Sequence, residues 1–252
     1  MIRSIFSLVL LALSITGVQA ADTAYISPQD IDLTRILAPP PGPDSPGTQE
    51  DLRVLLELQA KRTPQMVAEA QADAEITLSR FSDAVGTDLS RTRAPRANAL
   101  IDKVRATVSP IVGYAKTFWQ RPRPYVLFPQ VQLVLPSEKS YAYPSGHTAY
   151  GMSTAIVLAN MVPEKAGAIF ARGRQYGWNR AVGGVHYPSD VDAGRLAGTA
   201  IMALILRSPA FQEDLKLARA EIRGLLGLPL ESAETPAASG APILPAAAAP
   251  AR

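Results

Sequence analysis

The chain of 252 residues contains no cysteine. Disulfide bonds, thiol nucleophiles and cysteine-based metal sites are therefore excluded, and the stability of the fold must come from packing. Histidine is nearly as scarce, with two residues, His147 and His186. Any chemistry that needs an imidazole as an acid, a base or a nucleophile must use one of these two side chains.

Long apolar runs and a strong charge bias are also missing. After the first twenty residues, no uninterrupted apolar stretch reaches the roughly eighteen residues that a membrane-spanning helix needs. The longest stretches, 152–162 and 196–206, are interpreted as buried core helices. The formal net charge is +3 and falls to +2 without Arg3. A nucleic-acid binder would carry a concentrated basic stripe, so no nucleic-acid-binding role is expected.

The two ends of the chain differ from its middle. Residues 1–20 combine a charged start, an apolar core and a small-residue exit, which predicts a secretory signal peptide cleaved after Ala20 and a periplasmic or secreted protein. A membrane anchor is the alternative, but the apolar core is short. Residues 21–48 form a proline-rich N-terminal segment that is expected to lie over the surface, and residues 229–252 read as an Ala/Pro-rich disordered tail.

Between these ends, residues 49–228 are long enough for one domain and carry helical apolar periodicity. The pattern predicts an all-α, single-domain helical bundle. The irregular stretch 122–143 is rich in proline and is expected to fold over the functional site, with a short strand at 131–134. Helices are predicted over 49–61, 64–81, 98–119, 146–161, from Pro163 toward Arg180, 188–206 and 209–225.

Three clusters of polar residues stand out in this chain. The first runs from Lys116 to Pro124, the second is Tyr143-Pro144-Ser145-Gly146-His147-Thr148, and the third runs from Asn179 to Asp190. Together they supply three fixed cations, a small-residue turn at a helix start, both imidazoles and a carboxylate four residues after one imidazole. This inventory is what phosphoryl transfer through a phosphohistidine requires.

The spacing of these clusters is Lys, six residues, Arg-Pro; then Pro-Ser-Gly-His; then Arg, five residues, His, three residues, Asp. In this ordered set the chain resembles the type-2 phosphatidic acid phosphatase superfamily, which includes vanadium haloperoxidases and bacterial class A non-specific acid phosphatases. The resemblance implies an all-α bundle of that type. One departure is Asn179, where the third block usually has serine before the arginine.

The roles of the catalytic residues follow from the resemblance. His186 is the expected nucleophile, and Asp190 is expected to fix its tautomer and stabilise its positive charge. His147 is expected to protonate the leaving group and later to activate water. A structural, hydrogen-bonded role is the alternative for each histidine.

A phosphate site is expected around these residues. Planar guanidinium groups hold two phosphate oxygens at once, and a helix start presents backbone N–H groups to an anion. The residues assigned to phosphate binding are Lys116, Arg123, Arg180, Ser145 and Gly146. If one helix continues between them, Lys116 and Arg123 lie two turns apart on one face.

Other side chains near the clusters are given different roles. Arg121, Arg172 and Arg174 are interpreted as solvated surface charges, and Asp192 is expected to pair with Arg195. Four aromatic residues flank the motifs and either line a leaving-group pocket or pack at its rim: Trp119, Tyr125, Tyr141 and Tyr143.

The sequence thus predicts an exported, soluble acid phosphatase of broad specificity for small phosphomonoesters, with an acidic optimum, no metal site and no cofactor. Vanadate, a phosphate mimic, is expected to inhibit. A lipid phosphate or isoprenoid pyrophosphate phosphatase, a vanadium-dependent haloperoxidase and a silent phosphate-binding protein are the alternatives. Relatives of this group form oligomers, so a homo-oligomer is also considered, although the sequence identifies no interface.

Overall fold

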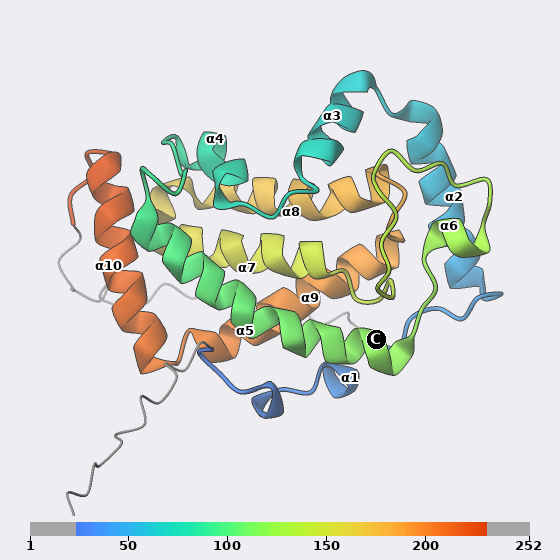
Figure 1. Cartoon of the computed structure of the whole chain (residues 1–252), viewed down its shortest axis with the longest axis horizontal. Helices are drawn as coiled ribbons and strands as arrows, with labels where there is room; N and C mark the ends of the chain where they lie inside the picture. The colour runs from blue at the N-terminus through green and yellow to red at the C-terminus, as the bar shows by residue number, and fades with distance from the viewer. Residues whose placement is uncertain (1–23, 231–252) are drawn as a thin grey trace, which may run out of the picture.

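The structure, a computed structural model, describes residues 24–230 (Figure 1). Within this range all regular elements are helices and no strand is formed, so the predicted all-α class is confirmed. The predicted signal peptide and residues 231–252 of the predicted tail lie outside the described residues. The elements are η1 (Pro28–Asp30), α1 (Leu33–Ile36), α2 (Pro46–Lys61), α3 (Pro64–Ala72), η2 (Leu78–Phe81), α4 (Ser82–Val85), α5 (Pro95–Trp119), α6 (Pro124–Leu127), α7 (Gly146–Met161), η3 (Pro163–Lys165), α8 (Ala166–Val182), α9 (Pro188–Ile205) and α10 (Pro209–Leu225).

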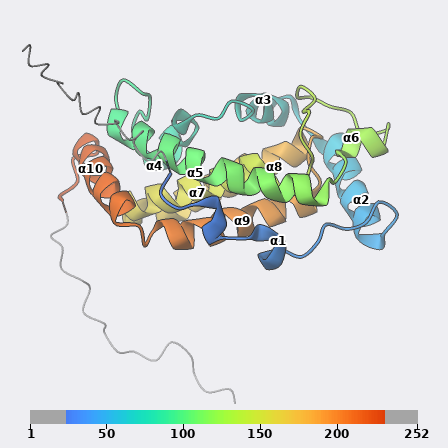
Figure 2. The same cartoon turned by 60° about the horizontal axis from the view of Figure 1, so that its bottom comes forward.

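Helix α7 lies at the centre of the bundle. It packs against α8 and α9 over most of its length, and α5 and α10 cover the rest (Figure 1). Its sequence is apolar on every side, as expected for a helix that is surrounded by others. Figure 2 shows α10 at one end of the molecule and α2 and α6 at the other. The prediction that 152–162 forms part of a buried core helix is confirmed.

Small residues on α9 let this helix approach the first turns of α7. A Cβ atom on Gly194 would lie 2.5 Å from the carbonyl oxygen of Ser145, and one on Gly198 would lie 2.6 Å from that of Ala149. Real Cβ atoms do not make such short contacts, so both positions require glycine. The close approach brings the N-terminal ends of α7 and α9 together.

The helix predicted over 64–81 is wrong in its second half, because α3 ends at Ala72. The next residue, Asp73, is fully buried and accepts hydrogen bonds from Arg80, Arg172 and Asn179. A buried carboxylate needs such partners, and they draw the chain out of the helical path. The interpretation of Arg172 as a solvated surface charge is also wrong, since it pairs with Asp73.

The strand predicted at 131–134 is not formed. Its backbone groups bond to a helix end and to side chains instead. The N–H of Val134 donates to the carbonyl of Gly183 at 3.3 Å, and the carbonyl of Gln132 accepts from Arg62 at 3.0 Å. A strand needs a neighbouring strand to satisfy its polar groups, and the described residues provide none.

The N-terminal segment from residue 24 onward runs along α5 (Figure 1). The backbone N–H of Tyr25 donates to Thr107 at 3.0 Å, and the hydroxyl of Tyr143 donates to the carbonyl of Ala38 at 2.5 Å. This segment leads into α2, which reaches the site described below. Among residues 24–230, no helix has the length and apolar character needed to cross a lipid bilayer.

Candidate active site

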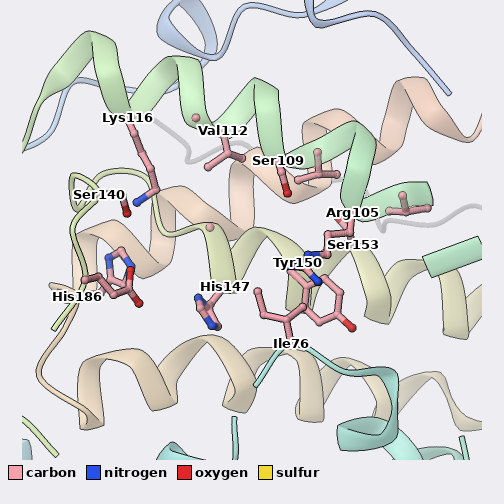
Figure 3. A pocket seen from close by; sticks show the side chains of 15 residues that line it. Ile76, Arg105, Ser109, Val112, Lys116, Ser140, His147, Tyr150, Ser153 and His186 are labelled. Carbon is pink, nitrogen blue, oxygen red and sulfur yellow. The ribbon is translucent and has the colours of Figure 1, made fainter. Parts of the chain in front are cut away.

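The three polar clusters meet at the N-terminal ends of α7 and α9. A cavity of about 260 Å³ opens beside them between α5 and α7, and Figure 3 shows the side chains that line it. At one end it is lined by four of the predicted site residues, Lys116, Gly146, His147 and His186, together with Glu138 and Ser140. Residues from distant parts of the chain thus share one concave surface.

His186 lies in the turn before α9 and is buried. Its Nδ1 is 3.1 Å from Oδ2 of Asp190, one helical turn later, and its Nε2 is 2.8 Å from Nη1 of Arg123. Because a carboxylate only accepts and a guanidinium only donates, Nδ1 carries the proton and Nε2 carries the lone pair. Burial and the nearby Arg123 hold the pKa of His186 well below its ordinary value. A neutral imidazole with a free Nε2 lone pair is the form that can attack phosphorus.

Asp190 is fixed by three further contacts. Its Oδ2 accepts from the backbone N–H of Tyr187 at 2.9 Å, and its Oδ1 accepts from Arg121 at 2.6 Å. Its own backbone carbonyl accepts from the N–H of Ser145 at 3.0 Å. Burial raises the pKa of the Asp190 carboxyl, and the Arg121 guanidinium acts in the opposite direction.

The interpretation of Arg121 as a solvated surface charge is wrong. Arg121 is 5% exposed, lies 3.9 Å above the ring of Tyr187, and bridges Asp190 to Asp51 of α2, with the second ion pair at 2.8 Å. Asp51 also accepts from the N–H of Ser189 at 2.9 Å. Arg121 lies inside the first motif, between Gln120 and Pro122, but nothing in the sequence distinguishes it from a surface charge. Asp51, within an ordinary amphipathic pattern, gave no signal.

Arg123 and Arg180 converge on one carboxylate, Glu138. The Nη2 atoms of both arginines donate to it, from the start of α6 and the end of α8. Partial burial alone raises the pKa of Glu138, but the two guanidinium groups together lower it below its ordinary value. Nε and Nη1 of Arg180 are buried and have no hydrogen-bond partner among the described residues. The sequence did not single out Glu138, because no periodicity or motif marks a loop residue whose partners lie far along the chain.

Lys116 extends from the last turn of α5. Its Nζ donates to the carbonyls of Tyr141 and Ala142, the latter at 3.3 Å. Burial and the neighbouring Arg123 lower the pKa of Lys116 to about 7. The expected two turns of continuous helix between Lys116 and Arg123 are not formed, because α5 ends at Trp119 and the next residue, Gln120, is left-handed with φ 50°. The two cations reach the site from different elements.

His147, in the first turn of α7, faces the cavity (Figure 3). Its Nε2 is 3.1 Å from the carbonyl of Ala74, which can only accept, so Nε2 carries a proton. Burial and the neighbouring Arg180 lower the pKa of His147 to about 4. The carbonyl of Ala74 is available to His147 because α3 ends at Ala72. Ala74 thus lies in the stretch for which the sequence wrongly predicted a helix.

Ser145 is the N-cap of α7, where its Oγ accepts from the N–H of Thr148 at 3.4 Å. Ser145 is fully buried and is not among the residues that line the cavity, whereas Gly146 is. Asn179, the departure from the usual motif, donates to Asp73 at 2.7 Å and accepts from Gln175 at 2.6 Å. It thus supports the buried Asp73.

The four flanking aromatic residues do not line this cavity. Trp119 and Tyr143 pack edge to face with their ring centroids 4.9 Å apart, so packing is the better account of both. The aromatic residue in the cavity is Tyr150. The predicted pair of Asp192 with Arg195 is confirmed. Within the described residues, no three His, Asp or Glu side chains gather as a candidate metal site.

Comparison with known proteins agrees with this geometry. The model of the PAP2 superfamily matches residues 104–214. The non-specific acid phosphatase of Salmonella typhimurium is 31% identical over 229 residues, covering 86% of this chain and 91% of that protein. The acid phosphatase of Zymomonas mobilis is 32% identical over 194 residues, 74% of each. A solved structure of a bacterial vanadium-dependent iodoperoxidase has the same fold, with a TM-score of 0.53 and 16% identity over 68% of this chain and 52% of that one.

The helical fold and the three-part site define a protein of the PAP2 superfamily. Within it, the similarity over most of the chain shows that this protein belongs to the non-specific acid phosphatases.

Proposed function

We propose that this protein hydrolyses phosphomonoesters through a phosphohistidine intermediate on His186. One observation carries the proposal. Two guanidinium groups, Arg123 and Arg180, converge on the Glu138 carboxylate beside the Nε2 lone pair of His186. Two buried nitrogen atoms of Arg180, Nε and Nη1, have no partner among residues 24–230. Buried donors without partners are costly, and three phosphate oxygens would satisfy them.

Binding requires two exchanges in this site. The phosphoryl group takes the place of the Glu138 carboxylate on both arginines, and Arg123 moves its Nη1 from His186 to a phosphate oxygen. Lys116 and the N–H groups at the start of α7 add positive potential. These cations neutralise the negative charge of the phosphoryl oxygens, so the Nε2 lone pair can approach the phosphorus atom.

In the first chemical step, a bond forms between Nε2 of His186 and phosphorus while the bond to the leaving oxygen breaks. Asp190 stabilises the imidazolium charge through Nδ1–H. His147 gives a proton to the leaving oxygen. The Nε2–H of His147 donates to the carbonyl of Ala74, so the proton that is transferred is the second one of the imidazolium, on the other ring nitrogen. In the second step His147 takes a proton from water, the water oxygen bonds to phosphorus, and the nitrogen–phosphorus bond breaks.

Broad specificity is supported by the chemistry of the cavity. All the cations assigned to substrate binding act on the phosphoryl group, and Val104, Val108 and Val112 give the adjoining wall an aliphatic surface without hydrogen-bonding groups. Such a wall accepts leaving groups by size and polarity. We also propose that residues 1–20 direct export; the N-terminal sequence of the mature protein tests this and should begin at Ala21.

The test is hydrolysis of p-nitrophenyl phosphate in EDTA by wild type, His186→Ala and, as a control, Arg174→Ala at an exposed position of α8. We expect metal-free turnover by wild type and the control, and a loss of about 10⁴-fold or more in kcat for His186→Ala. Circular dichroism checks that each variant is folded. A folded wild type without turnover, or a His186→Ala variant that retains it, would overturn the proposal.

A further inference from the structure

The cavity continues well beyond the phosphate end. It runs between α5 and α7 and is lined on the α5 side by Val112, Val108 and Val104, spaced four residues apart on one helix face. On the α7 side it is lined by His147, then Tyr150, then Ser153 at three-residue intervals, and Ile76 lies below them in Figure 3. The cavity therefore has the form of an aliphatic channel with the phosphate site at one end.

Two polar groups lie at the far end of this channel. Ser153 is 1% exposed, and its hydroxyl has no hydrogen-bond partner in the part of the chain that the structure describes. The side chain of Arg105 lies beside Tyr150 and Ser153 (Figure 3). Within residues 24–230 it forms no ion pair, and the carboxylate nearest to it in sequence, Asp102, pairs with Arg91 at 2.6 Å. An unpaired cation and an unsatisfied buried hydroxyl thus face the same space.

The distance between the two ends limits what can bind both. Lys116 and Arg105 are eleven residues apart on α5, which corresponds to about 16 Å along the helix axis. Both side chains reach into the cavity and shorten this span. A leaving group of the size of two aromatic rings therefore extends from the phosphate site to Arg105, and its body contacts the valines.

We propose that the far end of the cavity is a subsite for a second acidic group on the leaving group, held by Arg105 and Ser153. The preferred substrates are then phosphomonoesters with an apolar body and a distal carboxylate or phosphate. This inference rests on the proposed function, because the phosphoryl group must bind beside His186. The subsite would select among leaving groups by their distal charge, which the aliphatic wall does not do.

The test compares two substrates that differ only at the distal end: 4′-phosphonooxybiphenyl-4-carboxylate and the corresponding neutral carboxamide. We expect wild type to have a KM lower for the carboxylate by about two- to fivefold, the range of an exposed ion pair. The preference should decrease in high salt, which screens exposed charges. It should disappear in Arg105→Ala, persist in Arg105→Lys, and be unchanged in the exposed-position control Arg174→Ala.

Ser153→Ala should raise the KM for both substrates, because both distal groups accept a hydrogen bond. Equal KM values for the two substrates in wild type, or a preference that survives in Arg105→Ala, would overturn the subsite. Hydrolysis of p-nitrophenyl phosphate is measured on the same preparations. If that activity is absent, the proposed phosphatase function fails; if it is present while the carboxylate preference is absent, the subsite alone fails.

Discussion

Glu138 pairs with Arg123 and Arg180, the two arginines that hold the phosphoryl group in the proposed mechanism. In that mechanism its carboxylate competes with any other anion. Glu138→Gln keeps the shape of the side chain and removes its charge, so it should bind phosphate and vanadate more tightly. We expect the inhibition constants to fall by about fivefold, equivalent to about 1 kcal/mol.

The measurement is inhibition of p-nitrophenyl phosphate hydrolysis by each anion, with Lys139→Ala at the neighbouring exposed position as control. Weaker inhibition of Glu138→Gln would contradict competition. It would mean that Glu138 holds the two arginines in place while the substrate is bound.

The pKa of His147 sets the expected pH dependence. Burial and Arg180 lower it to about 4 in the free protein. In the proposed mechanism His147 acts as an acid, so its active form is lost as the pH rises through that value. A bound phosphoryl group adds negative charge and raises this pKa. The decline of kcat with rising pH should therefore lie at higher pH than the decline of kcat/KM.

Both declines should vanish in the residual turnover of His147→Asn, whose side chain at position 147 cannot titrate, so that only the ionisation of the substrate remains. The measurement is the pH profile of kcat and of kcat/KM, with wild type and variant compared on the same substrate. A decline in kcat/KM at higher pH than that in kcat would contradict the assigned role of His147.

At the scale of helices, the site depends on the contact between α7 and α9. Gly194→Ala would place a Cβ atom 2.5 Å from the carbonyl of Ser145 and 2.8 Å from Thr148, so the two helices must separate. We expect a loss of stability of about 1–3 kcal/mol and a lower kcat, because the separation moves His186 away from His147.

Gly167→Ala in α8 is the matched control, since nothing lies within 4 Å of its Cβ position and alanine favours a helix. Urea unfolding and kcat of the two variants are compared. A Gly194→Ala variant as stable and as active as wild type would show that the close approach is not needed.

The helices that the sequence predicted well are those with uninterrupted apolar periodicity and clear ends. The helix predicted over 146–161 matches α7, and the one over 209–225 matches α10. The prediction over 64–81 failed at Asp73, whose four-group network forms between α3, η2 and α8. Such a network depends on tertiary contacts, which helical periodicity does not record.

In the site, too, features carried by the local sequence were predicted and features that depend on tertiary contacts were not. The motif residues were predicted from their spacing, and the structure brings them together. Arg121 and Glu138 were missed, because a buried charge in a loop looks like a surface charge until its partner is known. Their partners, Asp51 and Arg180, lie 70 and 42 residues away along the chain.

For the molecule as a whole, Arg121 joins three distant parts of the chain. It pairs with Asp51 of α2 and Asp190 of α9, and all three residues are at most 5% exposed. Arg121→Met would remove the guanidinium group from two buried carboxylates, which would keep only their other hydrogen bonds. We expect the free energy of unfolding to decrease by about 3–5 kcal/mol, whereas substitution at exposed Arg174 should change it by less than about 0.5 kcal/mol.

Arg121→Lys, which keeps the charge but makes fewer hydrogen bonds, should fall between these values. Urea unfolding of the three variants measures the difference. If Arg121→Met is as stable as wild type, the network does not contribute to holding α2 and α9 together.

The most direct test of the proposed mechanism is to trap the intermediate on His186. His147→Asn is mixed with p-nitrophenyl phosphate, whose leaving group needs little protonation, and is quenched in alkali, since phosphohistidine is labile in acid. Mass spectrometry of the peptides locates any phosphoryl group. The mechanism predicts phosphate on His186, because water is not activated without His147. Rapid release of p-nitrophenol with no phosphorylated peptide, or with phosphate on another residue, would contradict it.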